Sequence, residues 1–324
     1  MDFVLDVFDT YLLDALYSKL VPLSAFVVPE YQVSPNASVA PAVSHWSKIV
    51  SLLPHPPIIQ DDAPFSQNLQ ISAWSREYIP RQILSLSIIT LVGIHLLYFV
   101  FAGLSYRYIF NQDMKRHPRF LKNQVKLEIQ SSLQAFPAIT LMTLPWFLAE
   151  ARGYSKLYDG LDTYGYPYLF ASAPFFLLFT DYCIYWVHRW LHIPAIYKAL
   201  HKAHHKWIIP TPFASHAFHP IDGYLQSVPY HLFIFLFPVH RMLYLGMFVF
   251  VNFWSIFIHD SDMITGHPLE SVINGPAHHT LHHIYFTVNY GQYFTWADRV
   301  SKSYRQPESG LDPLLEIKAQ RKVD

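Results

Sequence analysis

HRWLHIPAIYKALHKAHHKW, residues 188–207, holds five histidines and no aspartate, glutamate or cysteine. A second run, AHHTLHH at 277–283, repeats the HxxHH spacing of the first. Imidazoles crowded in this way repel one another when protonated and leave hydrogen-bonding capacity unused when neutral. A bound metal ion removes both costs, because neutral imidazole is a good metal ligand. The two runs therefore predict that the chain binds metal.

The spacing of these histidines predicts helical pieces that each present imidazoles on one side. The first run continues a stripe at i, i+4, i+7 and i+11, made of Asp181, Tyr185, His188 and His192. Each HxxHH run places three histidines at i, i+3 and i+4: His201, His204 and His205, then His279, His282 and His283. These eight imidazoles exceed the four ligands of a tetrahedral zinc site, so two metal ions are the expected number.

The ligand type leaves several metals open. An all-imidazole set suits iron, zinc, copper or nickel. Iron permits oxygen activation and attack on an unactivated C–H bond, whereas zinc has no redox chemistry. Asp181 and Asp260 are candidate carboxylates that would accept a ring N–H and fix the tautomer of a ligand. A membrane location would favour an apolar substrate, and with it C–H chemistry and iron.

The composition is that of a membrane protein. Apolar residues make up 52% of the 324 residues and charged residues 14%, against about 25% charged in soluble domains. A formal net charge of zero gives no reason to expect a nucleic-acid partner. The one cysteine excludes an intramolecular disulfide and thiolate-rich metal sites.

Stretches without charged residues predict the membrane spans. They cover 83–106, 129–149 and 163–180, and a longer region, 223–258, is broken only by His240-Arg241 and would form a helical hairpin. The fold class predicted is therefore all-α: a polytopic membrane protein with about four transmembrane helices and a cytosolic, histidine-rich helical cap. We divide the chain into an N-terminal segment (1–82), two spans with a basic loop (83–160), a catalytic domain (161–305) and a tail (306–324).

Loop charges orient these spans. Six basic residues between the first two spans predict a cytosolic loop by the positive-inside rule: Arg107, Lys115, Arg116, Arg119, Lys122 and Lys126. The third span then delivers His188 to the cytosol, and the hairpin returns the second histidine run to the same side. This topology places the N-terminus in the lumen, where Asn36-Ala37-Ser38 would be a glycosylation acceptor.

The N-terminal segment begins with an amphipathic pattern. Its apolar residues recur at helical spacing: Phe3, Val4, Val7, Phe8, Leu12, Leu13 and Leu16. The helix would either pack on the rest of the protein or lie in the membrane interface. Residues 28–82, rich in proline and serine, are predicted to be mostly irregular.

Longer motifs resemble a known family. HRWLH, LHKAHHKW, TPFASHAFHPIDGYLQS and NGPAHHTLHHIYFTVNYGQYFT are similar to those of the fungal sterol C-5 desaturases, also called lathosterol oxidases, in the fatty-acid hydroxylase and sterol desaturase superfamily. The resemblance extends to 117–160 and to the N-terminal MDFVLDVFDTYLLDALY, so it covers nearly the whole chain. It departs at Ile193, where family members often carry histidine, and at TWADR (295–299), which stands for a family LWDR.

The resemblance implies an enzyme of the endoplasmic reticulum membrane with two iron ions. The enzyme would use O2 and electrons from NAD(P)H, delivered by cytochrome b5 and its reductase. It would introduce the C5–C6 double bond into a Δ7-sterol in ergosterol-type sterol biosynthesis. By motif match, the metal ligands would be His188, His192, His201, His204, His205, His259, His279, His282 and His283.

Other residues near these motifs have open roles. His216 and His219 match the HAFHP element and would either bind metal or line the substrate pocket, while His278 would lie beside the ligands or in that pocket. Lys198, Lys202 and Lys206 recur at every fourth residue and would either dock the acidic surface of cytochrome b5 or anchor the chain at the membrane surface.

Two other functions remain open at this stage. A superfamily hydroxylase or C-4 methyl oxidase would use the same metals but insert oxygen. A non-catalytic metal-binding protein of the membrane would need histidines along a path across the bilayer, whereas the predicted topology gathers them on one face.

Overall fold

The structure is a computed structural model that describes residues 1–26, 45–57 and 71–320. The described residues are mostly helical. The helices are α1 (Asp2–Phe8), α2 (Asp14–Leu20), α3 (His45–Val50), α4 (Ile79–Tyr108), α5 (Gln124–Ala151), α6 (Gly165–Leu191), α7 (Pro194–Ile196), α8 (Pro220–Leu236), α9 (Arg241–Ile258), α10 (Pro276–Tyr285), α11 (Trp296–Val300) and α12 (Pro313–Gln320). Two-residue strands, β1 (Leu157–Tyr158) and β2 (Val239–His240), pair in parallel. The all-α prediction is confirmed, apart from this short pair.

Four helices are long and apolar enough to cross a membrane: α4, α5, α6 and α9. They contain or overlap the predicted spans, and α5 continues through Pro137 and Pro145 without a break. Proline is tolerated inside membrane helices because neighbouring groups satisfy the freed backbone carbonyl. Helix α6 runs eleven residues beyond the predicted end of its span, at Thr180, and this extension carries His188. The prediction of about four membrane helices is therefore confirmed.

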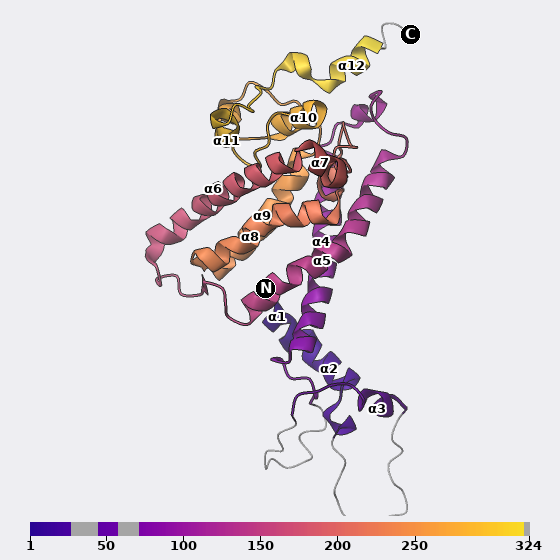
Figure 1. The fold of residues 1–324 in the computed structure, drawn as a ribbon, viewed down its shortest axis with the longest axis vertical. Coiled ribbons are helices and arrows are strands. Elements are labelled where there is room, and N and C mark those ends of the chain that lie inside the picture. Colours follow the sequence, from indigo (N-terminus) through magenta and orange to yellow (C-terminus); the bar gives the residue numbers. More distant parts are fainter. Residues whose placement is uncertain (27–44, 58–70, 321–324) are drawn as a thin grey trace, which may run out of the picture. The chain divides into compact units, whose positions relative to one another are not determined.

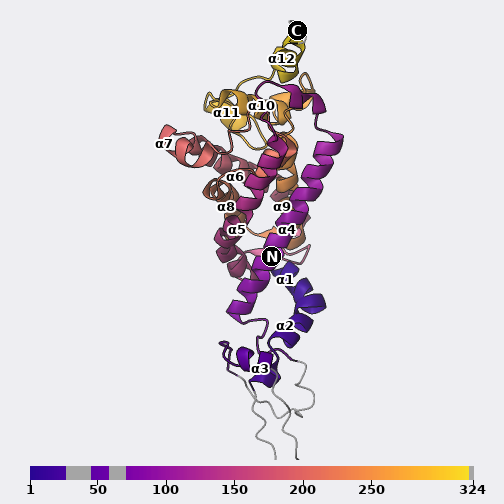
Figure 2. The same cartoon turned by 90° about the vertical axis from the view of Figure 1, so that its right-hand side faces the viewer.

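The chain divides into two compact units. One contains 90–146 and 153–324, including most of α4 and α5 and all of α6 to α12. In it α8 packs against α6, and α8 and α9 form the predicted hairpin, with His240 in β2 between them. Aromatic side chains of these helices make its core, around Phe176, Phe233 and Tyr244. Figures 1 and 2 show α10 and α11 at the end of the long helices where α6 finishes.

The other unit contains 1–89 and 147–152. Helix α1, a π-helical turn (Asp9–Leu13) and α2 follow one another without interruption, as the N-terminal periodicity predicts. The side that is buried carries Leu5, Asp9, Leu13 and Tyr17. Arg81 forms an ion pair with Asp9 at 2.6 Å, and both side chains are almost fully buried.

Most of the predicted apolar face of this helix lies on the outside. Phe3, Val7, Phe8, Leu12 and Leu16 are exposed, and Leu13 is the member of the predicted set that is buried. Of the two roles left open by the sequence, this arrangement favours the interfacial one, since five apolar residues of the predicted face are exposed. The acceptor sequence at Asn36 lies outside the described residues, as does much of the segment predicted to be irregular.

Candidate metal centre

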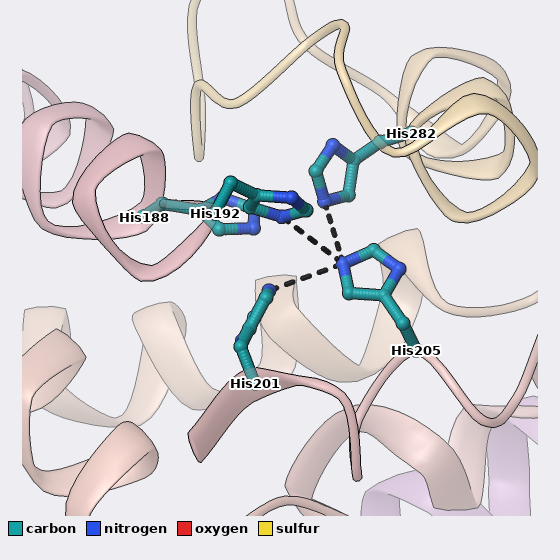
Figure 3. Close-up of side chains that lie close together, drawn as sticks. All are labelled: His188, His192, His201, His205 and His282. Carbon is teal, nitrogen blue, oxygen red and sulfur yellow. Dashed lines mark hydrogen bonds between the residues drawn. The ribbon is translucent and has the colours of Figure 1, made fainter. Parts of the chain in front are cut away.

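Nine histidines gather into two clusters in the unit that contains α6 to α12. The first cluster consists of His188, His192, His201, His205 and His282, and the second consists of His204, His259, His279 and His283. Within each cluster the nitrogen atoms that could bind a metal lie within 4.8 Å of one another. Figure 3 shows the first cluster, with rings from α6, from the 201–205 turn and from α10 directed toward a common centre. These are the nine histidines that the sequence nominates as ligands.

Each HxxHH run is shared between the clusters. His204 and His205 are adjacent, yet they belong to different clusters, as do His282 and His283. On α10 this follows from helix geometry, because successive residues point about 100° apart. In the first run a π-helical turn (Tyr197–His201) is followed by non-helical turns at 202–206. The expectation of one helical ridge per run is therefore wrong for His201, His204 and His205.

Backbone and carboxylate acceptors fix the tautomers of the first cluster. The Nδ1–H groups of His188 and His282 donate to the carbonyl oxygens of Tyr290 (2.9 Å) and Val288 (2.7 Å). His201 Nδ1 lies 2.7 Å from a carboxylate oxygen of Asp222. In a neutral ring a protonated Nδ1 leaves Nε2 as a lone pair. These three rings therefore turn unprotonated Nε2 atoms toward the centre of the cluster.

The converging lone pairs lack enough protons to bind one another. His205 Nε2 lies 3.1 Å from the Nε2 atoms of both His201 and His282, and 3.2 Å from that of His192. One proton on His205 could serve a single neighbour, so the remaining lone pairs would face each other. His188 Nε2 is buried with no hydrogen-bond partner among the described residues. A cation at the centre satisfies all of these atoms, so the donor set fits a metal ion.

The second cluster repeats this pattern with four rings. His259 Nδ1 donates to the carbonyl oxygen of Ser255 at 2.6 Å, which leaves its Nε2 as a lone pair. That atom lies 3.0 Å from His279 Nε2 and 3.3 Å from His204 Nε2. His283 Nε2 lies 3.1 Å from His279 Nε2. Four imidazole nitrogens thus meet at a second point, which also fits a metal ion.

Burial keeps these rings neutral. It lowers the pKa of His259 to about 4. Burial, and then repulsion from neighbouring imidazoles, holds the pKa values of five further rings well below the usual value: His204, His205, His279, His282 and His283. Neutral imidazole is the form that binds metal, so the clusters are ready for coordination at physiological pH. An all-imidazole set suits iron, zinc, copper or nickel.

A loop at 288–294 carries the two carbonyls that orient His188 and His282. Asp298 accepts hydrogen bonds from the backbone N–H groups of Tyr290 (2.9 Å) and Gly291 (2.8 Å). Asp181 accepts three more, from the N–H groups of Gln292, Tyr293 and Phe294, at 2.7–3.2 Å. Both carboxylates are buried. They hold the loop, and through it the tautomers of two cluster histidines.

The carboxylates nominated by the sequence do not contact imidazoles directly. Asp181 binds the loop backbone, and Asp260 accepts the N–H of Asp262 at 2.9 Å. The expectation that either accepts a ring N–H is therefore wrong. The carboxylate that does so is Asp222 in HPIDG, on α8. Asp222 is far in sequence from the two histidine runs, so their spacing did not indicate it. Its position just after HAFHP could have done so.

Three further nominated histidines lie outside both clusters. His216 contacts the side chains of Ser215 (2.9 Å) and Asn252 (3.3 Å). His219 accepts the N–H of Ile221 and so caps α8, and His278 Nδ1 accepts the N–H of Gly275 before α10. Each has a local hydrogen-bonding role. Lys198, Lys202 and Lys206 are exposed beside the first cluster's turn.

Comparisons with known proteins agree with this geometry. The family model for fatty acid hydroxylases matches residues 173–303, a range that contains all nine cluster histidines. No solved structure matches the chain.

Full-length relatives carry a more specific name. The chain is 48% identical to a Delta(7)-sterol 5(6)-desaturase of Gibberella zeae, over 98% of this chain and 93% of that protein. It is 49% identical to another from Aspergillus fumigatus, over 81% of this chain and 86% of that protein. A third, from Eremothecium gossypii, is 47% identical over 96% and 90%.

Proposed function

This chain belongs to the Delta(7)-sterol 5(6)-desaturases and is a sterol C-5 desaturase, an oxidoreductase of the membrane, and from that premise we propose that two iron ions in its histidine clusters serve the reaction. The observation that supports iron binding is the convergence of unprotonated Nε2 atoms at two buried points. The ligands of the proposal are the nine cluster histidines.

The reaction removes one hydrogen from C5 and one from C6 of a Δ7-sterol. The C–H bond at C6 is the weaker of the two, because C6 is allylic to the Δ7 double bond. The balance requires O2, two electrons and two protons, and yields the diene and two molecules of water. When bound, the iron pair would supply the redox chemistry of O2 that imidazole and carboxylate side chains lack.

The protein's own groups position this chemistry. Four of the nine rings are directed by hydrogen-bond acceptors: His201 by Asp222, and His188, His282 and His259 by the carbonyls of Tyr290, Val288 and Ser255. Asp181 and Asp298 hold the loop that carries two of those carbonyls. Phe233 is fully buried in the aromatic core of α6, α8 and α9, so its side chain supports the site as packing. These contacts fix the donor atoms before any metal arrives, which lowers the cost of ordering them.

The electron donor of the proposal is cytochrome b5, reduced from NAD(P)H by its reductase. Three exposed lysines support it, because Lys198, Lys202 and Lys206 flank the turn that carries three cluster histidines. A cationic face of this kind suits an acidic redox partner. The proposed location is the endoplasmic reticulum membrane, with the histidine clusters on the cytosolic side. The basic loop between α4 and α5 supports that orientation.

Complementation tests the function most directly. The chain would be expressed in yeast that lacks its own sterol C-5 desaturase, beside a variant with His259→Ala. We expect the wild-type chain to restore a conjugated 5,7-diene sterol, detected by its near-ultraviolet absorption, and the variant to restore none.

Product mass separates the other outcomes. A sterol that gains one oxygen and lacks diene absorption would identify a hydroxylase or a C-4 methyl oxidase step. Purified protein that holds no iron, together with unchanged sterols, would refute the iron-dependent desaturase proposal.

A further inference from the structure

Asp222 makes a contact that sets the first cluster apart. Its carboxylate lies 2.7 Å from His201 Nδ1, and both side chains are completely buried. The other carboxylate oxygen accepts a hydrogen bond from Gln226 Nε2 at 2.7 Å. Among the described residues, no arginine or lysine forms an ion pair with Asp222. The fold therefore buries an anion whose neighbours are an imidazole and a neutral amide.

A buried carboxylate without a cationic partner is costly. Removing a charge from water is strongly unfavourable unless an opposite charge compensates it. The first turn of α8 offers only a partial positive charge, which is too little on its own. A metal ion held by His201 Nε2 would supply the missing positive charge. The imidazole would then transmit the carboxylate's charge to the metal.

The second cluster has no such carboxylate among the hydrogen bonds of its described histidines. Its oriented ring, His259, donates to a neutral backbone carbonyl. The second cluster also offers four imidazoles where the first offers five. Both differences favour tighter metal binding at the first cluster, because an additional donor and a ligand that is held by a carboxylate each strengthen metal binding.

We propose that Asp222 is a positioning residue that makes the two metal sites unequal, so that the first cluster holds its ion more tightly than the second. This rests on the proposed function, in that both clusters bind metal. The carboxylate fixes the His201 tautomer, so that Nε2 is the free donor atom, and balances the charge of the bound ion. The weaker site is the four-histidine cluster.

Stepwise removal of iron tests this proposal. The purified full-length protein would be loaded with iron(II) without oxygen and equilibrated with increasing concentrations of a chelator. Iron per chain should fall in two separate steps in the wild-type protein. The His259→Ala variant should show the tighter step alone, which assigns that step to the first cluster.

Asp222→Asn removes the charge but keeps the size of the side chain. We expect it to shift the tighter step by about 10- to 100-fold in chelator concentration and to leave the weaker step in place. Glu128→Gln is the matched control, because Glu128 is a buried carboxylate that binds Gln124 and Thr211 and contacts no cluster histidine. That variant should leave both steps unchanged.

Stability of the metal-free protein separates charge transmission from a structural role. If Asp222 served only to hold α8 against His201, Asp222→Asn would lower the melting temperature of the metal-free protein and move both steps together. Gln226→Leu provides a second variant should Asp222→Asn not fold, and it should shift the tighter step by a smaller factor. An unchanged tighter step in a folded variant of either kind overturns the proposal.

The outcomes distinguish this proposal from the one on which it rests. A wild-type protein that binds no iron refutes the metal-dependent function itself. A wild-type protein that binds two iron ions in one indivisible step, and produces the diene, refutes only the inequality of the sites.

Discussion

His204 and His205 are neighbours in the chain, but their rings serve different clusters. The ring of His205 faces His201, His192 and His282, while that of His204 faces His259. The backbone between His201 and Trp207 is turned rather than helical, and this geometry separates the two rings. Two consecutive residues thus contribute to two different buried sites.

Single substitutions of these neighbours should therefore have separable effects on metal content. We expect His205→Ala to lose the ion of the first cluster, and His204→Ala that of the second, each leaving about one iron per chain. Iron analysis of the two purified variants, combined with chelator titration, measures this. The interpretation fails if both variants lose the same step, or if either retains two ions. Both should lose diene formation.

Residue types and spacing nominated eight of these histidines, and the family resemblance added His259, but neither predicted how the nine are grouped. Helical periodicity predicts neighbours on one helix, whereas His259 joins His204 and His279 through the packing of α9 against α10. Asp222 was missed because its contact with His201 spans 21 residues across a turn and a loop. A pattern of residue spacing does not show which residues from separate segments come into contact in the folded chain.

The loop at 288–294 is an element in which close packing leaves no spare room. A Cβ atom on Gly291 would clash with the backbone carbonyl oxygen of Phe294 and lie 3.1 Å from Asp298 Oδ2. The side-chain amide of Asn274, which donates to the Gly291 carbonyl oxygen, would lie 3.2 Å from the same Cβ. Any displacement of this loop would move the carbonyl groups that orient His188 and His282.

We expect Gly291→Ala to destabilise the protein by about 1–3 kcal/mol and to weaken iron binding at the first cluster. Melting temperature and iron per chain measure the two effects. Gly246→Ala in α9 is the control, because nothing lies within 4 Å of the added Cβ and alanine favours a helix, so iron content should stay unchanged and the melting temperature should not fall. Normal iron content in Gly291→Ala would show that the loop does not orient the ligands.

The lysines of the 198–206 segment permit a test of electron delivery. Replacing Lys198, Lys202 and Lys206 together with alanine should raise the concentration of cytochrome b5 needed for half-maximal turnover by about tenfold. The reason is the loss of electrostatic complementarity with an acidic partner, an effect that salt should mimic in the wild-type protein. Unchanged turnover across cytochrome b5 concentrations would instead identify these lysines as membrane anchors.

At the scale of elements, uncharged stretches predicted the membrane helices well. The stretch at 83–106 lies inside α4, and that at 129–149 lies inside α5. Hydropathy locates such helices because lipid requires apolar side chains over about 20 residues. Hydropathy alone stopped at Thr180, since Asp181 and His188 are polar residues that face the protein interior. The helical stripe of Asp181, Tyr185, His188 and His192 predicted the rest of α6, which ends at Leu191 with His192 as its C-cap.

At the scale of the whole molecule, the histidine clusters and the buried N-terminal ion pair lie in different compact units. Every cluster histidine belongs to the unit of 90–146 and 153–324, whereas Arg81 and Asp9 belong to the other unit. Removing one partner of a buried ion pair leaves an uncompensated charge, which costs about 3–5 kcal/mol. A substitution that destabilises the N-terminal unit should therefore leave the metal content of the protein unchanged.

Arg81→Leu tests this separation. We expect protease cleavage within residues 1–26 to accelerate and the melting temperature to fall, while iron per chain stays at two. Arg76→Leu is the control, because Arg76 is 37% exposed and should have a smaller effect. Loss of iron in Arg81→Leu would show that the two units depend on each other.

The sequence also indicated the N-terminal helix, but not the side that it buries. Periodicity finds an apolar face and assumes that the protein covers it. Here the buried side carries Asp9 beside Leu5, Leu13 and Tyr17, because the ion pair of Asp9 with Arg81 satisfies both charges. Which side faces inward depends on a partner 72 residues away.

That helix has consequences for handling the protein in the laboratory. Tyr11 is 83% and Leu12 55% exposed, so contact with lipid or detergent chains is more favourable for the outer side of this helix than contact with water. A preparation stripped of amphiphiles would leave these side chains to find one another on separate molecules. Self-association through the N-terminal helix would then be the first sign that lipid had been removed. It would precede any change in the buried histidine clusters.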